Sequence, residues 1–193
     1  RRPHTDGLNL DSAGVTLDER GFVKVDAHHL AAPGVWAVGD VVGGLLLAHK
    51  ATEEGVAVAE RLAGKAGHFD ANIIPAVCYT DPEIAWMGLT ETQAQAQGIE
   101  YDKAVFPWAA SGRALATGRD EGMTKALFDK KTRRLIGAAM TGVNAGELIA
   151  EAVLALEMGA DSHDIGLTIH PHPTLSETLF FAAEMVEGSI TDL

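Results

Sequence analysis

The chain has 193 residues, of which 47% are hydrophobic and 22% are charged, and it contains a single cysteine. Its 15 basic and 27 acidic side chains give a formal net charge of −12, which repels the phosphates of nucleic acids and anionic lipid headgroups. The single cysteine excludes an internal disulfide scaffold, and the apolar runs are too short to cross a bilayer. We therefore expect a globular cytoplasmic protein that has neither nucleic acid nor a membrane as its partner.

The first third of the chain predicts two short strands and one helix. Alternating residues indicate a strand over 21–26, and an apolar run after a Pro-Gly turn indicates another over 35–38. Helical spacing begins after Gly44 and stops at Gly64. Its buried face is expected to consist of Ala51, Gly55, Val58, Ala59 and Leu62. Small and polar residues follow the helix, so we place a domain boundary after residue 70.

Residues 71–193 alternate between the periods of strands and helices. Strands are predicted over 76–79, 84–87, 101–106, 123–128 and 135–140. Helices are predicted over 90–97, 148–156 and 175–186, each followed by a glycine. A polar turn joins the last two strands into a hairpin. This order predicts an α+β fold, in which helices cover one face of an antiparallel sheet.

The densest group of reactive side chains is the segment H-P-H-P-T-L-S-E at 170–177. Each histidine precedes a proline, which favours extended backbone. Thr174 and Glu177 match a helix capping box, in which the glutamate accepts a hydrogen bond from a backbone amide. Alternatively, the Glu177 carboxylate orients the His172 ring and leaves its other nitrogen free to take a proton. A third interpretation is a metal site with His170, His172 and Glu177 as ligands; the remaining histidines and Cys78 show no spacing that would complete it, and we predict no metal.

A second candidate site follows the strand predicted at 35–38. Asp40 stands at the carboxyl end of that strand, where ligands of α/β sheets bind and a carboxylate can accept hydrogen bonds from hydroxyl groups. The helix that begins near Ala48 offers unpaired N–H groups to an electron-rich ligand. An ordinary Gly-Asp turn explains Asp40 equally well, and the chain contains no G-x-G-x-x-G or Walker A motif.

Taken together, several segments resemble the C-terminal part of the dihydrolipoyl dehydrogenases, a family of flavin-dependent disulfide oxidoreductases. They are R-R-P-H-T-D-G-L-N-L at 1–10, V-W-A-V-G-D-V-V-G-G-L-L-L-A-H-K-A at 35–51, Y-T-D-P-E-I-A-W-M-G-L-T-E at 79–91 and H-P-H-P-T-L-S-E at 170–177. The second segment also suits glutathione reductases and soluble transhydrogenases. The doubled histidine, F-P-W-A-A-S-G-R-A at 106–114 and E-G-S-I-T-D-L at 187–193 resemble the bacterial dihydrolipoyl dehydrogenases.

The resemblance implies a division of the chain into domains and a role for each candidate residue. Residues 1–70 would contain the end of an NAD-binding domain and the C-terminal part of an FAD-binding domain, and residues 71–193 would form an interface or dimerisation domain. His172 would be the catalytic acid and base, with Glu177 as its partner. Contacts with FAD would come from Asp40, Leu46, Leu47, Ala48, His49 and, through its backbone, His170.

The activity that the resemblance implies is the oxidation of protein-bound dihydrolipoamide, with electrons passing through a redox disulfide and FAD to NAD. The implied partners are a second copy of the chain, whose active site receives the histidine, and the lipoyl domains and E2 core of a 2-oxoacid dehydrogenase complex.

The single cysteine sets a limit on this activity. Cys78 lies in a strand-like run, where we expect it to be buried. We therefore expect a fragment, cut at Arg1, that is inactive alone. The competing hypotheses are a non-catalytic dimerisation module, in which the His-Glu segment only caps a helix, and a fragment of a glutathione reductase-like enzyme or a soluble transhydrogenase.

Overall fold

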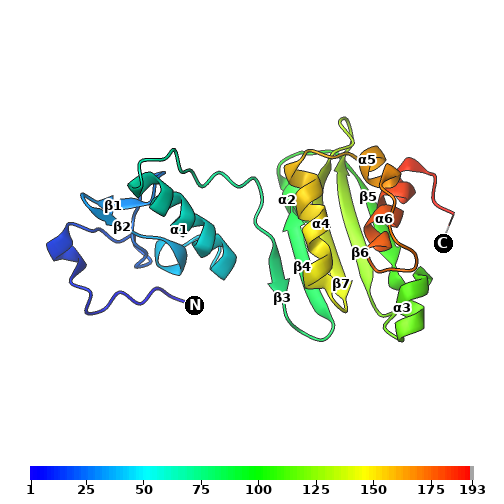
Figure 1. Cartoon of the computed structure of the whole chain (residues 1–193), viewed down its shortest axis with the longest axis horizontal. Helices are drawn as coiled ribbons and strands as arrows, with labels where there is room; N and C mark the ends of the chain where they lie inside the picture. The colour runs from blue at the N-terminus through cyan, green and yellow to red at the C-terminus, as the bar shows by residue number, and fades with distance from the viewer. Residues whose placement is uncertain (192–193) are drawn as a thin grey trace. The chain divides into compact units, whose positions relative to one another are not determined.

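A computed structural model describes residues 1–191, so the last two residues of the segment E-G-S-I-T-D-L lie outside the described part. The chain divides into two compact units, Arg1–Ala71 and the residues from Asn72 onward. Figure 1 shows the helices and strands of each unit. Within the described residues, no helix is both long and apolar enough to span a membrane.

The first unit is built around a small hairpin and one long helix. Its regular elements are η1 (Leu10–Ala13), β1 (Leu30–Ala32), β2 (Val35–Trp36), η2 (Gly39–Val42) and α1 (Ala48–Leu62), where η denotes a 3-10 helix. The strand predicted over 21–26 is wrong, because this segment makes only one isolated bridge, between Leu17 and Val23. Turns centred on Asp18 and Asp26, whose carboxylates accept backbone amides, limit the extended run on both sides.

The predicted helix is present as α1, but its buried face differs from the prediction. Leu62 is exposed, whereas Lys50 and Glu54 are buried. The Lys50 Nζ lies 2.6 Å from Glu54 Oε1 and donates a hydrogen bond to the carbonyl of Gly43 at 3.2 Å. The second oxygen of Glu54 accepts the N–H of Gly39 at 2.7 Å. This buried ion pair fixes both ends of η2 against α1.

The second unit confirms the predicted α+β fold. Its elements are β3 (Ala76–Cys78), β4 (Glu83–Gly88), α2 (Glu91–Ala96), β5 (Tyr101–Pro107), η3 (Trp108–Ala110), α3 (Gly112–Thr117), β6 (Met123–Asp129), β7 (Leu135–Gly142), α4 (Ala145–Glu157), α5 (Ser162–Leu167) and α6 (Glu177–Glu187). The strands form one antiparallel sheet in the order β3-β4-β7-β6-β5. Helix α4 packs on β4 and β7, and α6 packs on β5 and β6, over the same face (Figure 1). The helices α3 and α5 escaped prediction because six residues are too few to establish a helical period.

The main core lies between this sheet and the helices α4 and α6. Phe106 of β5 stacks on Phe181 of α6 with ring centroids 4.8 Å apart. Trp108 is fully buried, and its Nε1 donates to the hydroxyl of Thr124 on β6 at 3.0 Å. That hydroxyl donates in turn to the hydroxyl of Thr178 at 2.8 Å. The polar atoms inside the core are thus paired, and they tie the first turn of α6 to the sheet.

The other face of the sheet carries exposed side chains. Along β3, Val77 packs against the core under α4, so the next side chain, Cys78, points to the opposite face and is exposed. The expectation of a buried Cys78 is therefore wrong. Cys78 pairs with Ile84 across the ladder, and Ile84 and Trp86 share this face with exposed fractions of 46% and 37%.

Helix α2, predicted over 90–97, begins with a capping box formed by Thr90 and Gln93. Its first residue, Glu91, binds Lys125 of β6 at 2.7 Å and Lys103 of β5 at 3.0 Å. The hydrogen bonds from Lys125 and Lys103 lower the pKa of Glu91 to about 2. Because Lys125 alternates with the core residue Thr124, α2 is attached to the face of the sheet opposite α4 and α6.

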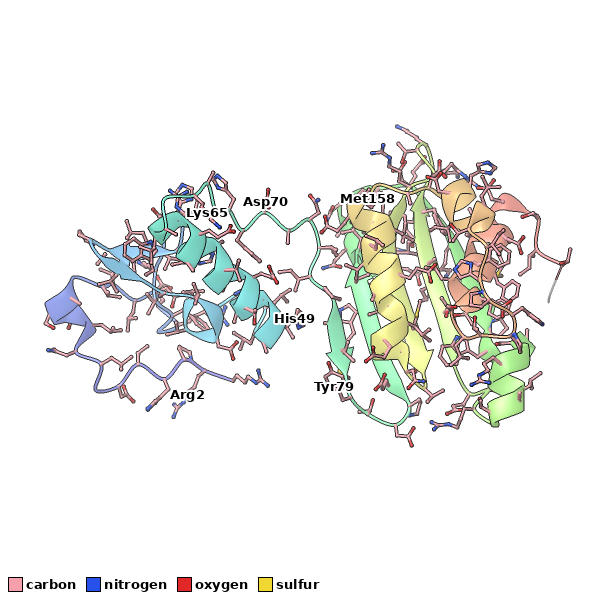
Figure 2. The ribbon with its side chains drawn as sticks, in the orientation of Figure 1. Arg2, His49, Lys65, Asp70, Tyr79 and Met158 are labelled. Carbon is pink, nitrogen blue, oxygen red and sulfur yellow. The ribbon has the colours of Figure 1, made fainter. Side chains whose placement is uncertain are left out.

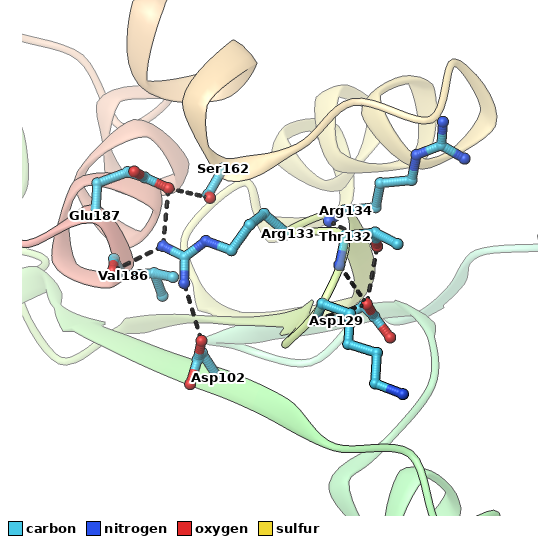
Figure 3. Close-up of polar contacts among 9 residues, drawn as sticks. Asp102, Asp129, Thr132, Arg133, Arg134, Ser162, Val186 and Glu187 are labelled. Carbon is cyan, nitrogen blue, oxygen red and sulfur yellow. Dashed lines mark hydrogen bonds and ion pairs between the residues drawn. The ribbon is translucent and has the colours of Figure 1, made fainter.

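The turn between β6 and β7 holds the C-terminal end of α6 (Figure 3). The Arg133 guanidinium donates to Asp102 on β5 at 2.9 Å, to the Val186 carbonyl at 3.0 Å and to Glu187 at 2.9 Å. The hydroxyl of Ser162 donates to the same oxygen of Glu187. The hydrogen bond from Ser162 has the larger effect, and together with that from Arg133 it lowers the pKa of Glu187. The Glu187 carboxylate in turn raises the pKa of Arg133. Helix α6 is thus fixed to the sheet at its last turn.

Candidate functional site

The segment before α6 presents one exposed histidine next to a buried glutamate. The Nδ1 atom of His172 lies 2.9 Å from Oε1 of Glu177, the first residue of α6. The exposed fractions of the two side chains are 76% and 10%. A carboxylate only accepts hydrogen bonds, so Nδ1 carries a proton, and in the neutral ring Nε2 keeps its lone pair. Among residues 1–191, no hydrogen-bond partner occupies Nε2, which leaves this atom available to another molecule.

Glu177 also takes part in capping the helix. Its Oε2 accepts the backbone N–H of Thr174 at 2.7 Å, which is one half of the predicted capping box. The other half is absent, because the Thr174 hydroxyl donates to the carbonyl of Pro171 at 2.7 Å and contacts Ser176. The two sequence interpretations of Glu177 are therefore compatible: one carboxylate oxygen orients a histidine ring and the other holds a backbone amide.

The side chain of His170 contacts a different set of residues and is only 6% exposed. Its Nε2 lies 2.6 Å from Glu151 Oε1 on α4, its Nδ1 lies 2.8 Å from the carbonyl oxygen of Thr168, and its ring lies 5.6 Å from that of Phe180. The two histidines thus contact different carboxylates. No cluster of three or more potential ligands in the described part of the chain could hold a metal ion.

Sequence reasoning missed Glu151 because it lies 19 residues before its partner. The one local observation that bears on the position of Glu151 is that the next residue of α4, Ala152, is fully buried.

The candidate residues of the first unit gather where η2 meets α1. Asp40 is exposed, and its Oδ2 lies 3.6 Å from the guanidinium of Arg1, which also donates to the carbonyl of Leu46 at 3.1 Å. Leu46 and Leu47 are half-buried, and Ala48 and His49 are exposed in the first turn of α1, where Figure 2 labels His49. The structure therefore groups the predicted site residues into two sets, one in each unit.

The set in the first unit offers both acceptors and donors. No side chain caps the first turn of α1, because its N-cap residue is Leu47, so backbone N–H groups and the positive end of the helix dipole are presented there. Gly39 and Gly43 have φ angles of 79° and 82°, and a Cβ on Gly43 would lie 3.2 Å from the ring of Phe22. This backbone-lined site, with the Asp40 carboxylate beside it, suits a ligand that carries both hydroxyl groups and electron-rich oxygens or nitrogens.

Comparison with family models places both units in one family. The model of the pyridine nucleotide-disulphide oxidoreductase dimerisation domain matches residues 74–183, and the model of pyridine nucleotide-disulphide oxidoreductases matches residues 1–55.

Curated relatives cover the whole chain. It is 52% identical to dihydrolipoyl dehydrogenase of Vibrio cholerae over 194 residues, which cover 100% of this chain and 41% of the relative. Its identity to the dihydrolipoyl dehydrogenase of Thermus scotoductus is 55% over 185 residues, covering 95% of this chain and 40% of the relative. The chain thus spans about two fifths of the length of these relatives.

Solved structures share the same architecture. The HOCl-induced flavoprotein disulfide reductase RclA of Escherichia coli matches with a TM-score of 0.90 and 30% identity, over 96% of this chain and 43% of that one. LpdA of Mycobacterium tuberculosis matches with a TM-score of 0.87 and 26% identity, over 96% of this chain and 41% of that one.

Proposed function

Because the chain belongs to the pyridine nucleotide-disulphide oxidoreductase family, we propose that it works as part of a dihydrolipoyl dehydrogenase. The proposed reaction converts dihydrolipoamide and NAD⁺ into lipoamide, NADH and a proton. The observation that carries the proposal is the contact of 2.9 Å between His172 and Glu177, which leaves a ring nitrogen unpaired on an exposed side chain.

His172 acts as the base in this proposal. Its Nε2 takes the proton from one thiol of dihydrolipoamide, and the thiolate attacks a protein disulfide to form a mixed disulfide. The attack breaks the protein S–S bond, and His172 passes its proton to the protein thiolate that is released. His172 then takes the proton of the second substrate thiol, whose thiolate displaces the second protein sulfur from the mixed disulfide. That sulfur takes up this proton, so the substrate leaves as a disulfide and the protein holds a dithiol. With reference pKa values, the first proton transfer is uphill by about 2.7 kcal/mol. The Glu177 carboxylate offsets part of this cost because it stabilises the imidazolium.

The residues of the first unit fit FAD. Asp40 would accept hydrogen bonds from the ribityl hydroxyls or lie on the phosphate side, while Leu46, Leu47, Ala48 and His49 would lie against the flavin at the uncapped end of α1. The contact of the His170 backbone with FAD stays a prediction of the family resemblance. When bound, FAD would accept two electrons from the dithiol and pass them to NAD.

The single cysteine means that the redox disulfide must come from outside these 193 residues. We infer that the isolated chain does not turn over. We also infer that two copies associate so that each His172 serves the partner's site. Four large apolar side chains of the second unit are exposed and support this association: Leu154 and Met158 of α4, of which Figure 2 labels Met158, and Leu167 and Ile169, with exposed fractions of 63%, 77%, 67% and 96%. Lipoyl domains and the E2 core of a 2-oxoacid dehydrogenase complex complete the proposed cytoplasmic assembly.

A chimera tests the proposed function. The segment of the Vibrio cholerae enzyme that matches this chain is replaced by residues 1–193, and the reduction of NAD⁺ by dihydrolipoamide is measured. We expect turnover from the flavin-loaded chimera and none from the isolated chain. His172→Gln should abolish turnover with dihydrolipoamide and preserve the oxidation of NADH by ferricyanide, which requires no thiol deprotonation. A flavin-loaded chimera without dihydrolipoamide activity would favour the alternative, a non-catalytic dimerisation module.

A further inference from the structure

The side chains of His170 and Glu151, with exposed fractions of 6% and 36%, have no part in the proposed chemistry. Both ring nitrogens of His170 are engaged, at 2.8 Å by the carbonyl oxygen of Thr168 and at 2.6 Å by the carboxylate of Glu151. A carbonyl oxygen only accepts, so the Nδ1 atom donates, and a further proton must lie between Nε2 and the carboxylate. With its ring also against Phe180 of α6, this side chain is held from three directions.

Only one residue separates this fixed side chain from His172. The sequence H-P-H-P restricts the backbone there, because each proline has a fixed φ and each histidine before a proline is confined to extended conformations. His172 itself is held through Nδ1 alone, and its ring is 76% exposed. The segment is thus suspended between two carboxylates, Glu151 on α4 and Glu177 on α6.

We propose that His170 and Glu151 are positioning residues, which hold the backbone of His172 where its Nδ1 can reach Glu177. Loss of the α4 anchor lets the segment move, so the contact of 2.9 Å is made only part of the time. The neutral ring of His172 then no longer keeps its proton on Nδ1, and Nε2 loses its free lone pair. The catalytic part of this inference rests on the proposed function, whereas the preferred tautomer of His172 does not.

The first test measures that tautomer in the full 193-residue chain. The ring nitrogens are labelled with ¹⁵N, and their chemical shifts are recorded at a pH where the His172 ring is neutral. We expect the Nδ1–H form in the parent and a mixture of the two tautomers in Glu151→Ala. Glu151→Gln should restore the parent form, because its amide can donate to Nε2 of His170. Glu147→Ala, a change of an exposed glutamate one turn earlier on α4, is the matched control.

The second test measures the same variants in the chimera. We expect Glu151→Ala to lower kcat with dihydrolipoamide about 10- to 100-fold, in the range of a small misplacement of a catalytic group. Turnover is expressed per flavin-loaded enzyme, and ferricyanide reduction by NADH, which requires no thiol deprotonation, should stay at the parent level. An unchanged His172 tautomer in Glu151→Ala would overturn the positioning role. An inactive parent chimera would instead count against the proposed function alone.

Discussion

Glu177→Gln is the sharpest perturbation of the proposed acid and base, because the two oxygens of this carboxylate have different partners. One accepts from the His172 ring at 2.9 Å, and the other accepts from the Thr174 amide at 2.7 Å. Both partners donate, whereas a glutamine amide has a single accepting oxygen. The amide oxygen of the glutamine in this variant can therefore accept from only one of the two partners at a time. Its NH₂ group then faces the other partner, which is also a donor.

The expected magnitudes follow from these contacts. A hydrogen bond to a charged group contributes about 1.5–3 kcal/mol, and because the His172 ring is 76% exposed, solvent screening places this contact at the lower end of the range. Loss of about 1.5 kcal/mol from the imidazolium corresponds to about a 10-fold lower rate of thiol deprotonation. If glutamine instead serves the ring, the Thr174 amide remains unpaired, which costs about 1 kcal/mol or more of folding stability.

The assay separates chemistry from stability. Turnover with dihydrolipoamide is measured in the chimera per folded, flavin-loaded enzyme, beside ferricyanide reduction by NADH and the thermal midpoint. We expect the first to fall and the second to remain at the parent level. If the thermal midpoint falls while turnover per folded enzyme is unchanged, Glu177 is a helix cap only and the role assigned to the pair is refuted.

Three further predictions concern the fold and are checked by urea unfolding. Lys50→Met should lower the free energy of unfolding of the first unit by about 3 kcal/mol or more, because it leaves the buried Glu54 carboxylate unpaired. A change in this free energy of less than about 0.5 kcal/mol would contradict the buried pair. Arg133→Met should cost about 1 kcal/mol, since its ion pairs are partly exposed, whereas Arg134→Met, which breaks no ion pair among the described residues, serves as the control and should cost less. The pKa of Glu91 lies at about 2 against an ordinary 4.5, so its pairs with lysine stabilise the fold above about pH 4.5 and lose this effect as the pH falls toward 2. The urea midpoints of the parent and Glu91→Gln should therefore differ near neutral pH and converge in acid, and a constant difference would be inconsistent with this.

The second unit was the more predictable from sequence, because its strands alternate and its longer helices repeat their apolar positions. The strands predicted over 101–106, 123–128 and 135–140 coincide with β5, β6 and β7 to within two residues at each end. The first unit was harder. Alternation over 21–26 indicates a strand, but it does not reveal that turns at both ends of this segment limit its pairing to one β-bridge. Helical spacing in α1 does not reveal that Lys50 and Glu54 form an ion pair in the protein interior. Such pairing depends on tertiary contacts.

The candidate site divides in the same way. His172 and Glu177 are five residues apart on one segment, so a local motif was enough to identify them as a pair. Glu151 was not predicted, because nothing near it in the sequence indicates that it contacts a histidine 19 residues later. Cys78 was misplaced because a strand-like run does not tell which face of an edge strand is covered.

The two attachments of α6 have a consequence for how the site comes into being. Its 11 residues span about 16 Å, with the His172 contact at the first turn and the Arg133 contact at the last. Arg133 lies 54 residues before Glu187, in a turn that exists only once β6 and β7 have paired. A copy in which β6 and β7 have not paired therefore lacks one of the two attachments of α6. Order at the first turn of this helix, where Glu177 contacts His172, is thus coupled to completion of the sheet.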